Sequence, residues 1–277
     1  MARSLRGTPS QGLWGATLGF FFGFAAVALF GPTAARFQQV MGLSPMAVGF
    51  LVAMPSLSGS LLRIPFAAWV ETTGGRKPFL VLLGLSSIGM AGLTAVAVWI
   101  YPDSLTAAWY PALLALGMLC GCGIATFSVG ISQVSYWHRQ RQQGRALALF
   151  GGLGNVAPGI FTLVLPFALG QWGLATSYVA WFVMLLAGTA LYAFMGRNSW
   201  YFQLRSQGVS DAEARREATA LGQELFPARN LIESLRESAH NPKTWALVFI
   251  YFTTFGGFIA LTAWLPTYYT HYFGLSP

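Results

Sequence analysis

Hydrophobic residues are collected into seven long stretches along this chain, and polar segments separate the stretches. A helix needs about 20 predominantly apolar residues to cross a hydrocarbon core about 30 Å thick. Each stretch meets that length, which predicts an all-α polytopic membrane protein. The predicted spans are residues 13–34, 46–70, 78–101, 109–136, 146–170, 175–196 and 244–269.

The composition agrees with this pattern. Of 277 residues, 55% are hydrophobic and 9% are charged, whereas a soluble domain carries about 25% charged residues. The lipid bilayer is therefore the first expected partner. Cys120 and Cys122 lie within the fourth span with neither further cysteines nor a histidine close by, so we expect no metal site there, and no cofactor.

The basic residues predict how the chain is oriented. Lys and Arg accumulate in loops that are not translocated, and outside the membrane they all lie on one side of the predicted topology except Arg36. We therefore expect a multi-pass protein of the cell's inner (plasma) membrane with a cytoplasmic N-terminus. The net charge of +8 then follows from topology. Since no soluble domain presents a basic face, we expect no nucleic-acid partner.

One long polar segment, residues 197–243, lies between the sixth and seventh spans and contains most of the charged residues. Ser210 and Glu213 have the spacing of a capping box, and the stretch DAEARREATALGQEL (211–225) alternates charged with apolar residues in a helical pattern. We predict a cytoplasmic linker helix, most simply a solvated connector, with a regulatory or partner-binding role left open.

The fifth span contains FGGLGNVAPG, whose glycine spacing matches a dinucleotide-binding loop. That fingerprint has meaning only between a strand and a helix, and no strand precedes it here. Asn155 instead shares one helix face with glycines at i−4 and i+4. Such a face either packs against a neighbouring helix or lines a substrate path on which Asn155 is accessible. The candidate path glycines are Gly151, Gly152, Gly154 and Gly159.

The second span, with PSLSGSLLRIPF, places Arg63 among apolar residues. An arginine at the centre of a membrane helix costs about 2.5 to 3.5 kcal/mol on insertion scales, and it cannot lose its proton. Arg63 could snorkel to the interface beside Glu71. However, Ser56, Ser60 and Arg63 share one face at i, i+4 and i+7, which favours a polar wall.

Every acidic residue lies at a span end or in a loop, so no carboxylate in the membrane neutralises Arg63. Proton-coupled cation and drug pumps usually rely on embedded Asp or Glu, and this chain lacks that device. A mobile anion is the natural counter-charge, since the guanidinium fork suits a planar oxyanion. Neither paired carboxylates nor a nucleophile with a base occurs near the membrane, so we expect no enzyme.

The seventh span repeats features of the first. GFAAVALFGPT (23–33) matches GFIALTAWLPT (257–267), and GLSP occurs at both 42–45 and 274–277. Parallel repeats of six spans joined by a linker are typical of the major facilitator architecture. We therefore expect residues 1–196 to form an N-terminal six-span bundle, 197–243 the linker, and 244–277 the first span of a truncated second bundle in a protein of about twelve spans.

Several stretches together resemble the nitrate/nitrite porter family of the major facilitator superfamily. The strongest are PSLSGSLLRIPF, RQQGRALALFGGLGN and YFTTFGGFIAL, and the weaker GGRKPF is similar to the superfamily's loop after span two. The resemblance implies a gating loop at Gly75, Arg76 and Lys77. In that loop Thr72 replaces the usual acidic residue, with Glu71 beside it. Two further departures are Ala157 in place of a glycine and Thr126 in place of an asparagine.

Carried over to this chain, the resemblance implies that Arg63 and Asn155 contact the anion and that Phe127, Tyr251 and Phe255 enclose it. Ordinary packing is the alternative for the two phenylalanines. The implied function is transport of nitrate or nitrite by alternating access, either as proton-coupled uptake or as nitrate/nitrite exchange. The alternatives are a carrier for another small anion, such as a monocarboxylate, and a membrane scaffold or sensor that transports nothing.

Overall fold

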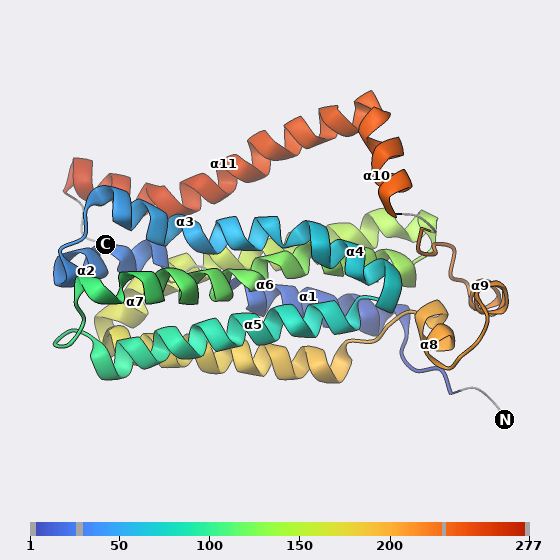
Figure 1. Cartoon of the computed structure of the whole chain (residues 1–277), viewed down its shortest axis with the longest axis horizontal. Coiled ribbons are helices and arrows are strands. Elements are labelled where there is room, and N and C mark those ends of the chain that lie inside the picture. Colours follow the sequence, from blue (N-terminus) through green and yellow to red (C-terminus); the bar gives the residue numbers. More distant parts are fainter. Residues whose placement is uncertain (1–3, 26–29, 229–230, 275–277) are drawn as a thin grey trace.

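The computed structural model describes the backbone of residues 4–25, 30–228 and 231–274, and all regular elements in these ranges are helices (Figure 1). The chain is thus an all-helical polytopic membrane protein. The helices are α1 (Pro9–Ala25), α2 (Phe30–Met41), α3 (Pro45–Leu61), α4 (Arg63–Thr73), α5 (Arg76–Ala95), α6 (Tyr110–Trp137), α7 (Gln140–Met195), α8 (Trp200–Ser206), α9 (Asp211–Ala220), α10 (Leu231–His240) and α11 (Pro242–Phe273), with a π-helical turn at Val96–Ile100 and a 3-10 turn at Ala107–Trp109.

Four helical stretches are long and apolar enough to cross a membrane: 45–73, 76–99, 107–137 and 140–195. They match the second to sixth predicted spans to within two residues at the C-terminal ends of the third and sixth. The last stretch holds both the fifth and the sixth predicted spans. Gly173, with φ 74° and ψ 179°, separates them inside α7. This backbone conformation is open to glycine and strained for other residues.

Two other predicted spans are interrupted. The second is divided between α3 and α4 at Leu62. Pro65 has no N–H with which to bond the carbonyl of Leu61, which accounts for the break. The first is seen as α1 and α2 on either side of residues 26–29, which lie outside the described residues. The seventh falls within α11.

The transmembrane helices pack through small residues. α6 contacts α1, α3 and α5, and α1 runs along α7. A Cβ on Gly121 would overlap the Pro55 carbonyl, and one on Gly123 would overlap the Gly23 carbonyl, so these backbones approach as closely as glycine permits. Ser58 and Ser86 reinforce the contacts, because each Oγ donates to an α6 carbonyl at 2.8 Å.

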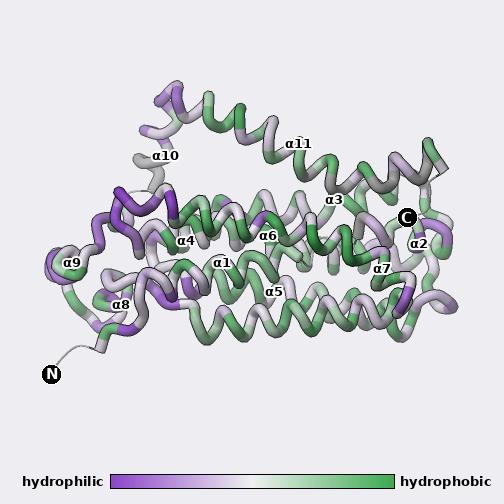
Figure 2. Tube along the Cα trace, turned by 180° about the vertical axis from the view of Figure 1, so that it is seen from behind, coloured by the Kyte–Doolittle hydropathy of each residue, from purple (hydrophilic) through white to green (hydrophobic). Residues whose placement is uncertain are grey.

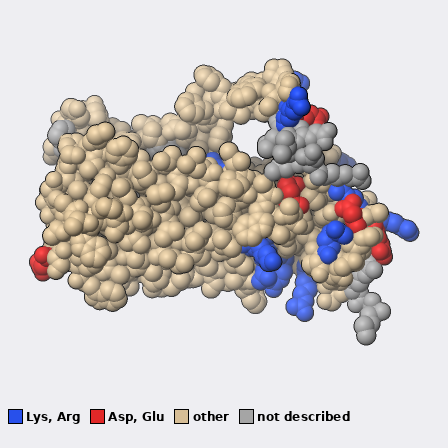
Figure 3. All heavy atoms as spheres, in the orientation of Figure 1, with Lys and Arg blue, Asp and Glu red and all other residues tan. Residues whose placement is uncertain are grey.

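Charged and hydrophilic residues gather at one end of the bundle, where α8, α9 and α10 lie (Figures 2 and 3). The prediction of a single helix over 211–225 was wrong in length, because α9 ends at Ala220. The capping site itself is confirmed, as Ser210 Oγ accepts from the Glu213 N–H at 3.3 Å. The helix stops because Gly222 takes φ 98° and the buried Gln223 side chain accepts from the Tyr201 N–H at 3.1 Å.

The last helix, α11, stands apart from the rest. It contacts α2 and α7 and diverges from the bundle towards α10, leaving open space beneath it (Figures 1 and 3). Most of its described side chains are exposed. Its apolar surface is therefore uncovered in this chain along much of its length.

Candidate anion site

Arg63 begins α4 directly after the break at Leu62. Its Cζ lies 5.3 Å from the centre of the Phe127 ring of α6 and 5.5 Å from that of Phe255 of α11. The two rings are nearly parallel, at 10°, with centres 6.4 Å apart. Three separate segments therefore meet at one guanidinium, and two of them contribute an aromatic ring.

The Arg63 guanidinium has no carboxylate partner within the part of the chain that the structure describes. Among the described residues it takes part in no ion pair, and its buried Nε has no hydrogen-bond partner. The Glu71 carboxylate is engaged elsewhere, because it accepts from the Tyr136 hydroxyl at 2.6 Å and from the Ala228 N–H at 3.0 Å. The structure therefore does not support snorkelling of Arg63 towards Glu71.

Tyr251 extends the aromatic group by one turn of α11. Its ring stacks on Phe255 with centres 4.9 Å apart and planes 9° apart, and the residue is 41% exposed. Phe127 also stacks on Phe150, with ring centres 5.9 Å apart, and contacts the fully buried Phe20, with ring centres 5.2 Å apart. The rings near Arg63 therefore continue into the bundle core, which holds Phe127 in place.

Asn155 lies in α7, one helical turn after Gly151. Its Nδ2 donates to the Gly151 carbonyl at 2.7 Å, and a Cβ on Gly151 would lie 3.8 Å from Phe127 Cε2. The amide nitrogen has a second N–H, and the buried Oδ1 has no hydrogen-bond partner among the described residues. Asn155 thus has hydrogen-bonding capacity left over one helical turn from Gly151, the residue of α7 that faces Phe127.

The glycines predicted to line a substrate path differ in their surroundings. A Cβ on Gly152 or Gly159 would meet nothing within 4 Å, and one on Gly151 would only touch Phe127. A Cβ on Gly154, in contrast, would overlap the ring of Phe20 in α1. Gly154 therefore belongs to the contact between α1 and α7, and the other three lie on an open part of α7.

A family model described as "Major Facilitator Superfamily" matches residues 16–277. The chain belongs to the major facilitator superfamily. The "Probable nitrate/nitrite transporter NarK2" of Mycobacterium tuberculosis is 30% identical over 254 residues, which cover 91% of this chain and 56% of that protein. The "Probable nitrate/nitrite antiporter NarK1" of Thermus thermophilus is 29% identical over 269 residues, which cover 95% of this chain and 54% of that protein. The "Nitrate/nitrite transporter NarU" of Salmonella typhimurium is 26% identical over 277 residues, which cover 93% of this chain and 53% of that protein.

These relatives confirm the resemblance noted from the motifs, and their names describe transporters and not enzymes. The chain spans about half the length of the curated relatives that it matches.

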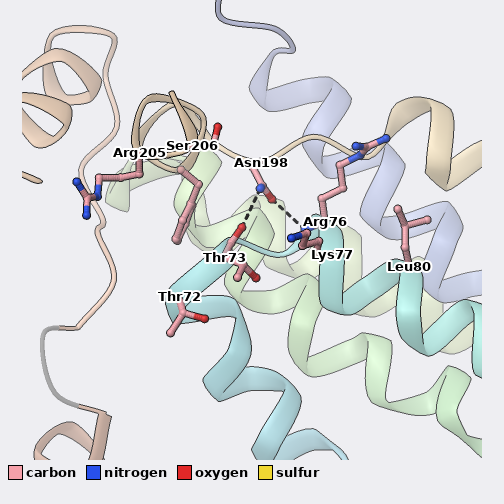
Figure 4. Close-up of a pocket in the computed structure, with 9 residues that line it drawn as sticks. Thr72, Thr73, Arg76, Lys77, Leu80, Asn198, Arg205 and Ser206 are labelled. Carbon is pink, nitrogen blue, oxygen red and sulfur yellow. Dashed lines mark hydrogen bonds between the residues drawn. The ribbon is translucent and has the colours of Figure 1, made fainter. Parts of the chain in front are cut away.

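The loop between α4 and α5, which contains the predicted gating residues Gly75, Arg76 and Lys77, is tied to the end of α7 and to the residues that follow it. Asn198 Oδ1 accepts from the Arg76 N–H at 2.9 Å, and its Nδ2 donates to the Thr73 carbonyl at 3.0 Å (Figure 4). Arg76 Nη2 donates to the Ala193 carbonyl at 3.0 Å. Gly74 takes φ 75° at the turn, and a Cβ on Gly75 would lie 2.7 Å from Gln133 Cβ, so both glycines are required by the local geometry.

Sequence reasoning missed Asn198, which closes this loop, and Phe150, which supports Phe127. Asn198 follows a span without any motif around it, so no local signal marks it. Phe150 begins the glycine-rich stretch of the fifth span, but its contact with Phe127 depends on how α6 and α7 pack.

Proposed function

We propose that this protein takes part in transporting nitrate or nitrite across the cell's inner membrane by alternating access, with Arg63 as the anion-binding group. The observation that carries the proposal is the Arg63 guanidinium, which lies over two aromatic rings and has no carboxylate partner among the described residues. The names of the relatives support the choice of anion.

The magnitudes favour an anion as the missing partner. Placing an arginine at the centre of a membrane helix costs about 2.5 to 3.5 kcal/mol, and a cation–π contact returns about 0.5 to 2 kcal/mol. A bound anion would supply the remaining stabilisation. Nitrate is planar, so two of its oxygens can accept from the guanidinium fork while its face lies against an aromatic ring.

The other residues have supporting roles in this proposal. Asn155 donates its free N–H to a substrate oxygen, and Phe127, Phe255 and Tyr251 exclude water from the anion. The open surface at Gly151, Gly152 and Gly159 leaves room for the substrate to approach. Substrate would then move between two bundles that rock around the site.

The orientation follows from the charged end of the bundle. Basic residues gather where α8 and α9 lie (Figure 3), and such residues stay on the cytoplasmic side. We therefore place α8, α9 and the N-terminus in the cytoplasm. Cysteine accessibility to an impermeant reagent, with single cysteines at exposed Ser10 and at Asp103, tests this orientation.

The deciding experiment is a titration of the purified protein in detergent with nitrate, nitrite, acetate and chloride, recording the thermal unfolding midpoint. A ligand that binds only the folded state raises that midpoint, and we expect nitrate or nitrite to do so at millimolar concentration. An equal response to acetate would favour a monocarboxylate carrier. A midpoint that no anion changes would contradict the proposal and favour a scaffold or sensor.

The coupling mechanism needs a flux measurement. Proton-coupled uptake and nitrate/nitrite exchange both fit a site of this kind, and protons are the candidate coupling ion in the first case. In reconstituted vesicles, uptake that requires a pH gradient supports proton coupling. Uptake that requires nitrite inside the vesicles and is indifferent to the gradient supports exchange.

A further inference from the structure

Two neighbouring cavities lie at the charged end of the bundle, away from the residues around Arg63. One has a volume of about 470 Å³ and lies between the start of α5 and α8, and the other has about 330 Å³ and reaches the N-terminal segment. Arg76 and Asn198 line both. Both volumes lie within the range of about 300 to 1,000 Å³ that is typical of ligand pockets.

The described residues that line these cavities carry positive charge and no negative charge. The cations are Arg6, Arg76, Lys77, Arg197 and Arg205. None of them forms an ion pair among the described residues, and the Nε of Arg76 is buried without a hydrogen-bond partner. Arg205 affects one carboxylate by its charge, that of Asp211, but Arg215 and Tyr201 already bind this carboxylate.

Hydrogen bonds hold the two residues that line both cavities. Asn198 bridges the Arg76 N–H and the Thr73 carbonyl, as Figure 4 shows. Arg76 is further held by its bond to the Ala193 carbonyl. The Lys77 side chain is exposed, and it forms no hydrogen bond with the other described residues. The larger cavity is thus lined both by a cation held by hydrogen bonds, Arg76, and by an exposed one, Lys77.

We propose that these cavities bind a phosphate group, carried either by an anionic phospholipid or by a free phosphate. Several cations without carboxylates attract a group with more than one negative oxygen. The larger cavity is also lined by Leu80 and Phe202. Leu80 lies one turn of α5 beyond Lys77, near the start of the predicted third span, so charge is followed by apolar surface, as in a phospholipid.

The test uses the purified protein in a neutral detergent and a phosphate-free buffer. Dioctanoyl phosphatidylglycerol, dioctanoyl phosphatidylcholine, inorganic phosphate and sulfate are each titrated while the thermal unfolding midpoint is recorded. We expect phosphatidylglycerol to raise the midpoint at concentrations at which phosphatidylcholine has no effect. A rise with inorganic phosphate as well would show that a free phosphate suffices. Equal responses to the two lipids, with no response to phosphate beyond that to sulfate, would overturn the proposal.

Matched variants locate the site. Lys77→Gln with Arg205→Gln removes two cavity cations, and we expect the concentration of phosphatidylglycerol needed for half the effect to rise about tenfold. The control, Arg141→Gln with Arg216→Gln, removes two exposed cations that lie at the same end of the bundle and line neither cavity. It should change the concentration of phosphatidylglycerol needed for half the effect less than twofold. Equal responses of the two double variants would overturn the proposal.

Two further variants remove ambiguity. Lys77→Gln alone leaves the bond from Arg205 to the Val209 carbonyl intact, so it answers the question if the double variant does not fold, with an expected rise of about threefold to fivefold. Arg63→Gln should keep the full response to phosphatidylglycerol, because Arg63 lines neither cavity. A response to phosphatidylglycerol that is lost in Arg63→Gln would place the phosphate at the Arg63 site and overturn the proposal.

Discussion

Two arginines in this protein lie over pairs of aromatic rings at nearly equal distances. The Cζ of Arg63 lies 5.3 and 5.5 Å from its two ring centres, and the Cζ of Arg215 in α9 lies 5.4 and 5.1 Å from its own two. They differ in counter-charge. Arg215 Nε donates to Asp211 at 3.0 Å, whereas Arg63 forms no ion pair among the described residues.

The comparison indicates what each arginine can do. We call Arg215 a closed unit, because its interactions are made within the protein. It pairs with the Asp211 carboxylate, lies over two rings and donates to the Pro227 carbonyl at 3.1 Å. Such a unit has little left to offer a ligand. Arg63 has the same aromatic surroundings without the carboxylate, in the part of the chain where an unpaired charge costs most. The absence of a carboxylate partner among the described residues is what makes Arg63 a candidate for binding a mobile anion.

The largest effect should come from giving Arg63 the carboxylate that Arg215 has. Asn155→Asp changes one side-chain group, one helical turn from the glycine that faces Phe127, at nearly constant volume. We expect apparent nitrate affinity to fall more than about a hundredfold, because an internal anion both neutralises Arg63 and repels the substrate at low dielectric. Nitrate titration of the unfolding midpoint measures this. Unchanged affinity in a folded Asn155→Asp protein would show that Asn155 is remote from the substrate.

Arg63→Lys should have the next largest effect. The charge remains, but an ammonium cannot present two parallel N–H donors to a planar anion. We expect about a tenfold to hundredfold loss of nitrate affinity, measured by the same titration. Arg215→Lys is the matched control at the closed unit and should leave nitrate affinity within twofold. Wild-type affinity in Arg63→Lys would mean that charge alone suffices at this position.

Asn155→Ala should have a smaller effect than either. It removes one neutral donor, for which a hydrogen bond contributes about 0.5 to 1.5 kcal/mol, so nitrate affinity should fall about twofold to tenfold. Expression and the unfolding midpoint without nitrate should stay close to those of the unmodified protein. A protein that fails to insert, or one that inserts and binds nitrate normally, would identify this face of α7 as structural.

Much of the fold could be predicted because membrane spans are encoded by the length of apolar stretches. The second to sixth predicted spans are matched by helices of sufficient length. The interruptions were not predicted. The break at Leu62 reflects a missing N–H at Pro65, and the early end of α9 depends on the contact between Gln223 and Tyr201. A contact of the latter kind cannot be deduced from helical periodicity.

The candidate site shows a similar division. An unpaired Arg63 could be inferred from the positions of the acidic residues alone. Its proximity to Phe127 and Phe255 followed only from resemblance, since no periodicity relates residues on three separate helices. The structure brings these three side chains together, and their role in binding an anion stays a prediction. The hydrogen bonds of Asn198 to Arg76 and Thr73 could be predicted neither from the sequence pattern nor from the resemblance.

The smallest effect concerns the closed unit itself. Hydrogen bonds from Tyr201 and Arg215 lower the pKa of Asp211 below its ordinary value of 3.8, so the folded state favours the carboxylate. This stabilisation is present above about pH 3.8 and is lost as the pH falls through the lowered pKa. Asp211→Asn should therefore speed hydrogen exchange in α9 slightly at pH 6, and the difference from the unmodified protein should shrink towards pH 3. Nitrate affinity should not change, and a loss of affinity would show that the linker and the Arg63 site are coupled.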